Sequence, residues 1–290
     1  MTRRNTDDTL QLPVAFLVRP SHAMHQATEV QSIPSVLGET IKRHVFAVQD
    51  YSLLALQALM DAFTPPQYWT DTLEQMDLIG VGSLPIVVIT SFFIGGVMVL
   101  QTAAQFQRFG ETALTGDAVS LALVRELGPA ITALLVAGRN ASGIASELGS
   151  MIVTEQVDAM RALGTDPVRK LVAPRLVATV IMMFFLTIIA DACGIAGGAL
   201  VAVGLLGLEG SAFFHTAFRS LIFGDVIEGL TKPLFSGFII ATVGCFYGLR
   251  TTGGTQGVGR STTQAVVASS VLIILFDFLV TKMMIGIFGR

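Results

Sequence analysis

A glycine-rich stretch, GGTQGVGRST at residues 253–262, comes closest in this chain to a nucleotide-binding motif. Read from Gly254, it is one residue away from the G-x-x-x-x-G-K-[ST] loop that holds nucleotide phosphates. That loop needs a lysine that reaches the phosphates, a strand before it and a helix after it. Here arginine replaces the lysine, and apolar segments flank the stretch on both sides. We therefore interpret it as a tight turn between two membrane spans, with Ser261 or Thr262 capping the second one.

Arg125 and Glu126 form an unusual charged pair, because they interrupt a long apolar stretch shortly before Gly128 and Pro129. Ionisable residues inside a membrane are costly and commonly mark a functional site. Neighbouring residues do not share a helix face, so we expect one of the pair to contact another span while the other lines a cavity. Pro129 interrupts the helical hydrogen bonds there, which membranes tolerate only where protein or water satisfies the backbone.

Two further acids, Asp191 and Asp277, also fall inside apolar segments. Asp191 precedes a patch of small residues, GIAGG at 194–198, which would allow two helices to approach closely. The simplest interpretation is that each acid makes a hydrogen bond between helices. The alternative is an ion-coupled secondary transporter that uses both as proton or ion sites. We find no pair of related halves in the sequence, as many such transporters would show.

A short polar helix is predicted at about 155–163, in the segment that follows the second long apolar stretch. Thr154 can cap its N-terminus, and Glu155 and Asp158 suit the positive end of its dipole. These acids and Arg161 form a polar face, which suggests a docking surface. A loop helix that rests on the membrane is equally compatible with this pattern.

The composition places these residues in a membrane protein. Hydrophobic residues make up 52% of the 290-residue chain, charged residues only 13%, and the mean hydropathy is +0.69. Soluble domains carry about a quarter charged residues. We expect an all-α integral membrane protein, because apolar stretches long enough to span a bilayer recur along the chain. The five predicted spans are 78–102, 118–146, 176–208, 233–249 and 264–288.

Two segments precede the first span. Residues 1–43 are expected to be a cytoplasmic arm of low order. Residues 44–66 have apolar side chains at helical spacing, interrupted by polar ones, which is typical of an amphipathic helix in the membrane interface. A solvent-exposed helix packed on a partner is the alternative.

The distribution of basic residues predicts the orientation, because cytoplasmic loops are enriched in lysine and arginine. A cytoplasmic N-terminus and five spans put the C-terminus in the periplasm. The cytoplasmic side then carries twelve of the 18 basic residues, namely Arg3, Arg4, Arg19, Lys42, Arg43, Arg139, Arg161, Arg169, Lys170, Arg175, Arg250 and Arg260. The other side carries six, namely Arg108, Arg125, Arg219, Lys232, Lys282 and Arg290.

Enzymatic chemistry has little support in the sequence. The four histidines lie outside the predicted spans, and Cys193 and Cys245 are far apart, each inside an apolar run. We interpret both cysteines as buried thiols and predict neither catalytic residues nor a metal site. No basic block suggests binding to nucleic acid.

Four motifs together resemble the MlaE/YrbE permease family, the membrane subunits of ABC transporters that move phospholipids or related lipids between envelope membranes. The resemblance covers about residues 45–288. Its motifs are RELGP (125–129), AGRNASGIASELGSMIVTEQVDAM (137–160), DPVRKLVAPR (166–175) and GGTQGVGRSTTQAVV (253–267).

The resemblance implies a homodimeric permease in the bacterial inner membrane that lacks its own nucleotide-binding domain. ATP and magnesium would be bound by a separate ATPase subunit, and an MCE-domain protein would bind the lipid in the periplasm. Some systems of this kind add a STAS-domain protein.

Site residues are also implied by the resemblance. Arg125 and Glu126 match a polar pair near the lipid cavity of the dimer. The short helix matches the family's coupling helix, which docks on the ATPase, and its candidate docking residues are Glu155, Gln156, Asp158 and Arg161.

Overall fold

The computed structural model describes residues 33–65 and 68–288, so most of the predicted arm, residues 1–32, lies outside the described residues. The described chain is helical and contains no strand, which confirms the expected all-α class. It divides into two compact units, Met1–Leu53 and Leu54–Arg290. The second unit holds all five of the predicted spans.

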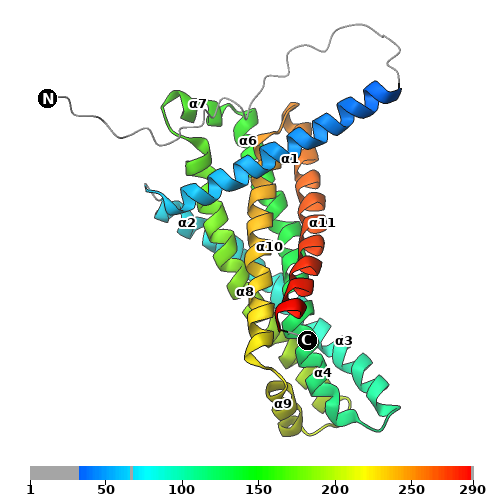
Figure 1. Ribbon diagram of the computed structural model, residues 1–290. Coiled ribbons are helices and arrows are strands. Elements are labelled where there is room, and N and C mark those ends of the chain that lie inside the picture. Colours follow the sequence, from blue (N-terminus) through cyan, green and yellow to red (C-terminus); the bar gives the residue numbers. More distant parts are fainter. Residues whose placement is uncertain (1–32, 66–67, 289–290) are drawn as a thin grey trace, which may run out of the picture. The chain divides into compact units, whose positions relative to one another are not determined.

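The helices follow one another along the chain with short connections (Figure 1). They are α1 (Ile33–Phe63), α2 (Trp69–Met76), α3 (Gly82–Gln107), α4 (Thr115–Ala122), α5 (Gly128–Val136), α6 (Ser142–Val153), α7 (Gln156–Ala162), α8 (Ala173–Gly204), α9 (Gly210–Arg219), α10 (Phe223–Leu249) and α11 (Gly254–Phe288). Four π-helical turns interrupt them, at Asp77–Val81, Leu123–Leu127, Ala137–Ala141 and Val168–Val172. A 3₁₀ turn covers Thr112–Leu114.

Five helical stretches of the described chain are long and apolar enough to cross a membrane, as predicted. They are Trp69–Gln107, Thr112–Val153, Val168–Gly204, Phe223–Leu249 and Gly254–Gly286. The first two each join helices through π-helical turns, and the third begins with such a turn directly before α8. The fourth begins about ten residues before the predicted start, because its first turns carry charged side chains that a hydropathy window rejects.

Helix α1 begins at Ile33, so residues 33–43 belong to the helix rather than to an arm of low order. Pro34 lies in the first turn, where its missing N–H costs no helical hydrogen bond. Helix α9 was not predicted at all. Its Phe213 and Ala217 are buried in a cluster with Val119 of α4, and a single pair of inward residues is too short a pattern to predict a helix.

The glycine-rich stretch begins helix α11 instead of forming a long turn. The turn itself is confined to residues 250–253, and Gly253 and Gly254 adopt positive φ angles of 87° and 66°. Ser261 lies inside the helix, where its hydroxyl is 2.9 Å from that of Thr251. The prediction that Ser261 or Thr262 caps the helix is therefore wrong, because the two positive-φ glycines complete the reversal seven residues earlier.

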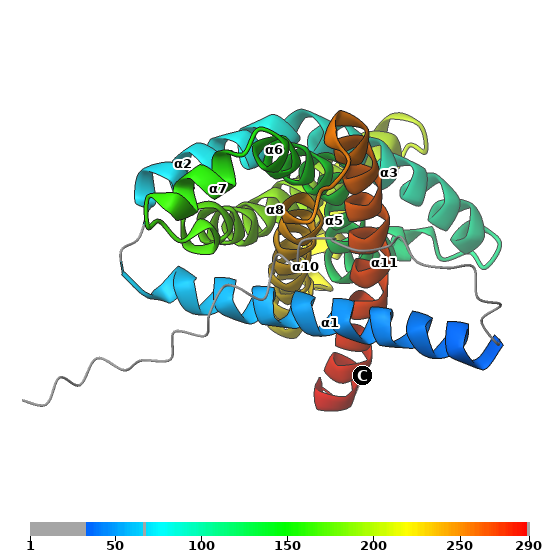
Figure 2. The same ribbon diagram turned by 90° about the horizontal axis from the view of Figure 1, so that it is seen from above.

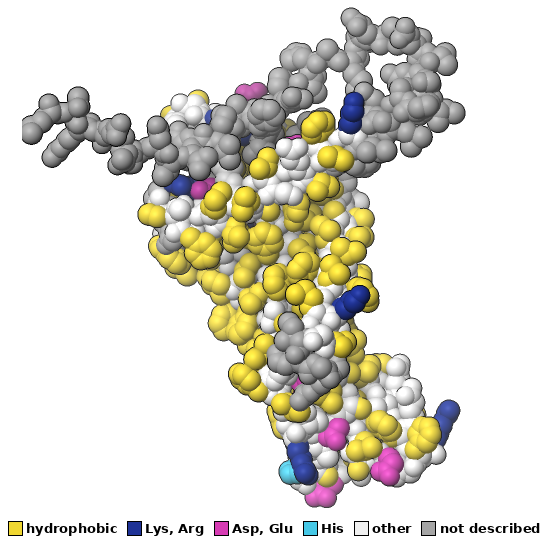
Figure 3. All heavy atoms as spheres, in the orientation of Figure 1, with side chains coloured by type: hydrophobic (Ala, Val, Ile, Leu, Met, Phe, Trp, Pro, Cys, Tyr) yellow, Lys and Arg dark blue, Asp and Glu magenta, His cyan; other side chains and the backbone are white. Residues whose placement is uncertain are grey.

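Within the second unit, α10 packs against α6, α8 and α11, and α8 also packs along α3 (Figure 2). The apolar window of α10 is 61% buried, whereas that of α11 is only 22% buried. Hydrophobic side chains cover much of the face shown in Figure 3. Helices α7 and α9 lie at opposite ends of this bundle, which we call the α7 end and the α9 end (Figure 1).

Glycines bring α3 and α8 into backbone contact. A Cβ atom on Gly95 would lie 1.8 Å from the carbonyl oxygen of Gly194, and one on Gly197 would lie 2.0 Å from that of Phe92. The GIAGG patch therefore does allow the close approach that the sequence predicted. No flexible side chain separates the two backbones, so the helices must move apart to accept any larger residue.

We expect Gly95→Ala to destabilise the protein by about 1–3 kcal/mol, the usual cost of overpacking. Thermal unfolding in detergent measures this loss. Gly138→Ala is the matched control, because a Cβ atom there would meet nothing within 4 Å. An unchanged unfolding midpoint for Gly95→Ala would contradict the close packing of α3 on α8.

Candidate functional site

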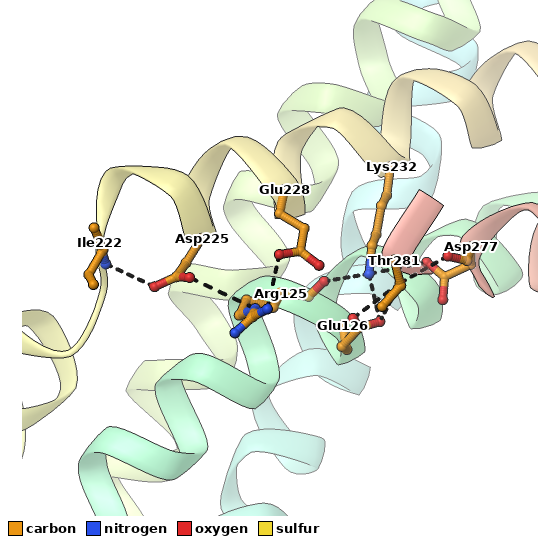
Figure 4. A network of polar contacts seen from close by, with 8 residues as sticks. All are labelled: Arg125, Glu126, Ile222, Asp225, Glu228, Lys232, Asp277 and Thr281. Carbon is orange, nitrogen blue, oxygen red and sulfur yellow. Dashed lines mark hydrogen bonds and ion pairs between the residues drawn. The ribbon is translucent and has the colours of Figure 1, made fainter. Parts of the chain in front are cut away.

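A network of charged side chains joins the second, fourth and fifth spans (Figure 4). Arg125 and Glu126 lie in the π-helical turn Leu123–Leu127, directly before α5. Such turns are rare and frequently occur at functional sites. The partners of these two residues come from the first turns of α10 and from α11. Since α10 starts close to α9 in the chain, the network lies in the half of the bundle nearer the α9 end.

Arg125 is held by two acids of α10. Its Nη2 atom is 3.1 Å from Oε2 of Glu228, and its Nε atom is 3.9 Å from Oδ1 of Asp225. Both acids are buried, whereas the Arg125 side chain is 28% exposed. Asp225 also accepts a hydrogen bond from the backbone N–H of Ile222 and so caps the start of α10.

Lys232 occupies the centre of the network, and its side chain is only 2% exposed. Its Nζ atom donates to Oε2 of Glu126 at 2.6 Å and to the carbonyl oxygen of Arg125 at 2.8 Å. Oδ1 of Asp277 lies 3.6 Å away. Pro129 has no N–H to offer the Arg125 carbonyl four residues before it. Lys232 therefore replaces the missing helical donor as well as pairing with the acids.

Both members of the Arg125–Glu126 pair thus contact α10, whereas the sequence predicted that only one would contact another span. Thr281 of α11 adds a hydrogen bond to Glu126 at 3.2 Å. Asp277 does contact another helix, but as an ion pair with Lys232 at 3.6 Å instead of the predicted hydrogen bond.

Three residues of the network, Asp225, Glu228 and Lys232, were not predicted as site residues, because the fourth span was predicted to start after them. The sequence does contain a pattern that could have predicted them, because spacings of three and four residues place all three on one face of a helix. A charged face that leads directly into an apolar helix predicts partners inside the membrane.

Asp191 of α8 lies against the backbone of Gly128. A Cβ atom on Gly128 would come within 1.7 Å of Oδ1 of Asp191. This oxygen is buried and finds no hydrogen-bond partner among the described residues. The expected interhelical hydrogen bond is therefore not made by Oδ1, and Asp191 stays outside the charged network.

The predicted polar helix is α7, Gln156–Ala162, at the α7 end of the bundle. Asp158 and Arg161 form an ion pair of 3.0 Å on its surface. Glu155 and Gln156 are exposed, and so is Leu163, which is 84% exposed although it is apolar. Exposed charges beside an exposed leucine are suited to contact with another protein.

The cap of α7 differs from the prediction. Glu155, not Thr154, occupies the N-cap position, and it does so in the left-handed region at φ 59°. The Thr154 hydroxyl instead donates back to the carbonyl of Ser150. Glu155 is also the second residue after the last residue of α6, a position where glycine is the usual left-handed residue. A glutamate there adopts a conformation that costs about 1–2 kcal/mol.

A second group of ion pairs links the π-helical turn that follows α7 to the end of α1 and to α2. Arg169 Nη2 is 3.1 Å from Oδ1 of Asp61, and Lys170 pairs with Asp71 while lying 4.2 Å from the ring centre of Tyr68. Burial raises the pKa of Asp61, although Arg169 acts in the opposite direction. These contacts connect the segment that follows α7 to the end of α1 and to α2.

Comparisons with known proteins agree with this architecture. A family model described as Permease MlaE matches residues 72–283. A probable ABC transporter permease protein of Rickettsia typhi is 40% identical over 87% of this chain and 98% of its own length. The intermembrane phospholipid transport system permease protein MlaE of Haemophilus influenzae is 36% identical over 73% of this chain and 82% of its own. A chloroplastic Arabidopsis thaliana protein, TRIGALACTOSYLDIACYLGLYCEROL 1, is 37% identical over 79% of this chain and 66% of its own length.

Proposed function

The chain belongs to the MlaE permease family, and from this membership we propose that it is the membrane subunit of an ABC transporter that moves phospholipid or a related lipid between envelope membranes. A separate ATPase subunit supplies the energy, which is the arrangement supported by the relatives described as ABC transporter permeases. The Haemophilus influenzae relative, described as an intermembrane phospholipid transport permease, supports the choice of substrate.

The observation that carries this proposal is the charged network inside the apolar bundle. Arg125 and Glu126 keep 28% and 41% of their side-chain surface exposed, although they lie within a span. An ionisable side chain that stays exposed inside the membrane has a high free-energy cost unless it contacts water, a partner or a substrate. A lipid head group is a substrate that brings matching charge to this depth.

The lipid is held between two copies of the chain. Helix α11 supports this arrangement, since its apolar window is only 22% buried and Val267, Val271 and Ile274 point outward. Apolar residues of the first, second and fifth spans hold the acyl chains, and Arg125 offers a charge-assisted hydrogen bond to the head-group phosphate. The cavity opens toward the periplasm, where an MCE-domain protein exchanges lipid with it.

Helix α7 couples this cavity to the ATPase. With the N-terminus and α7 on the cytoplasmic side, Glu155, Gln156, Asp158 and Arg161 face the ATPase subunit. Closure of the ATPase dimer on ATP pushes α7, and the rigid spans transmit the movement to the cavity as a switch between two packings. A small STAS-domain protein is the further partner that we propose at this end.

We expect Arg125→Ala and Glu126→Ala each to lower lipid transfer by about tenfold or more, equivalent to about 1.4 kcal/mol, while the complex still assembles. The measurement is transfer of fluorescent phospholipid by the complex reconstituted in vesicles. Arg108→Ala is the control, because Arg108 is exposed and lies outside the network. Transfer at the wild-type rate in both network variants would refute the role of this pair in lipid handling.

An ion-coupled transporter is the other candidate, with Asp191 and Asp277 as its ion sites. The family supports an ATP-driven mechanism instead. In the same vesicles, transfer that depends on ATP and is indifferent to proton and sodium gradients would exclude the ion-coupled mechanism.

A further inference from the structure

The charges of the network do not balance. Asp225 is left out of the count, because it makes a further contact of its own. Among the described residues the rest of the network contains three carboxylates, those of Glu126, Glu228 and Asp277, and two cations, Arg125 and Lys232. Its formal charge is therefore −1. One of the carboxylate oxygens, Oε1 of Glu228, is buried without a hydrogen-bond partner among the described residues. Uncompensated negative charge inside a membrane protein favours the binding of a positive group.

The exposed edge of the network is acidic as well. The side chains of Glu126 and Asp277 are 41% and 21% exposed, whereas Lys232 is 2% exposed. Two of the three lysine donors bind Glu126 and the Arg125 carbonyl, and Asp277 lies 3.6 Å from the same nitrogen. Lys232 therefore neutralises part of the charge from a buried position, where its own side chain is closed to a ligand.

Arg125 differs from Lys232 in this respect. Its contacts with Asp225 and Glu228 use Nε and Nη2, and a guanidinium has five N–H donors. Among the described residues Nη1 has no recorded partner, and the side chain is 28% exposed. The network therefore presents one donor for an anion, on Arg125, and two partly exposed acceptors for a cation, on Glu126 and Asp277.

We infer that this site selects lipids whose head group is zwitterionic, with an ammonium group beside the phosphate. The ammonium lies against Glu126 and Asp277, and the phosphate meets Nη1 of Arg125. A head group with a net negative charge would add to the existing excess of negative charge and is disfavoured. This inference rests on the proposed function, because it names the class of lipid that the same site takes.

The test uses the complete transporter complex, reconstituted in nanodiscs that contain equal amounts of phosphatidylethanolamine, phosphatidylcholine and phosphatidylglycerol. After re-extraction, mass spectrometry measures the retained lipids relative to the mixture. We expect the two zwitterionic lipids to exceed phosphatidylglycerol by about tenfold, which corresponds to about 1.4 kcal/mol. In the double variant Glu126→Gln/Asp277→Asn, this preference should fall to about threefold or less.

The control is Glu111→Gln/Glu209→Gln, which removes two exposed carboxylates outside the network and should keep the wild-type preference. If the double variant does not fold, the single variant Asp277→Asn tests the same point, and the wild-type ratio is decisive by itself. Equal retention of all three lipids, or more phosphatidylglycerol, overturns the inference. A preference unchanged in the network variants overturns its placement at Glu126 and Asp277. Retention of no lipid would instead count against the proposed function.

Discussion

Replacing Lys232 with methionine is expected to destabilise the protein by about 3 kcal/mol and to abolish lipid transfer. Removal of one partner from a buried ion pair leaves the remaining charge uncompensated, which typically costs about 3–5 kcal/mol. The lower end applies here, because Glu126 is 41% exposed and keeps part of its solvation. The variant also leaves the Arg125 carbonyl without the donor that stands in for the missing N–H of Pro129. Thermal unfolding in detergent and lipid transfer in vesicles measure the two effects.

Two comparisons isolate the charge effect. Lys282→Met makes the same substitution at an exposed lysine of α11, and it should change stability by less than about 0.5 kcal/mol. The triple variant Lys232→Met/Glu126→Gln/Asp277→Asn removes the orphaned charges together with their partner, so it should recover part of the lost stability. If Lys232→Met is no less stable than Lys282→Met, Lys232 does not organise the network.

Exchanging the charges of α7, as Asp158→Arg/Arg161→Asp, is expected to uncouple or dissociate the ATPase while the permease stays folded. The swap keeps an ion pair between the two positions, three residues apart on one helix face. Stability should therefore change by less than about 0.5 kcal/mol, since exposed pairs contribute little. A partner that complements the native charges instead meets like charges, which cost several kcal/mol at an interface. Co-purification of the ATPase and lipid-stimulated ATP hydrolysis should both fall about tenfold or more.

The matched control makes the same kind of swap on α9, as Glu209→Arg/Arg219→Glu. Both residues are exposed and lie at the other end of the bundle, so ATPase binding should stay at the wild-type level. Full ATPase binding by the α7 variant would show that another surface docks the ATPase.

Local composition and spacing were enough to predict much of this protein. The membrane class, the number of spans, the polar helix after the second span and the special status of Arg125 and Glu126 all follow from short windows of sequence. Each depends on the cost of placing a residue in water or in lipid, which is a property of that residue and its near neighbours. For the same reason the phosphate-loop resemblance at residues 253–262 could be dismissed, since its surroundings are apolar.

Capping could not be predicted in the same way. Thr154 has the better capping side chain, yet Glu155 occupies the N-cap of α7 in a strained backbone conformation. Ser261 has the right chemistry for a cap but lies well inside α11. In both cases the direction in which the chain must leave one span and enter the next outweighs the preference of a single side chain.

The network itself was decided only by the tertiary structure. Lys232 donates to residues more than a hundred positions earlier in the chain, Arg125 and Glu126, and Thr281 reaches Glu126 from the last span. Sequence alone determined that charges lie at membrane depth and that they need partners. Which acids they pair with, and that the carboxylates outnumber the cations, depends on helices packed side by side. That packing sets the excess charge from which the choice of lipid is inferred.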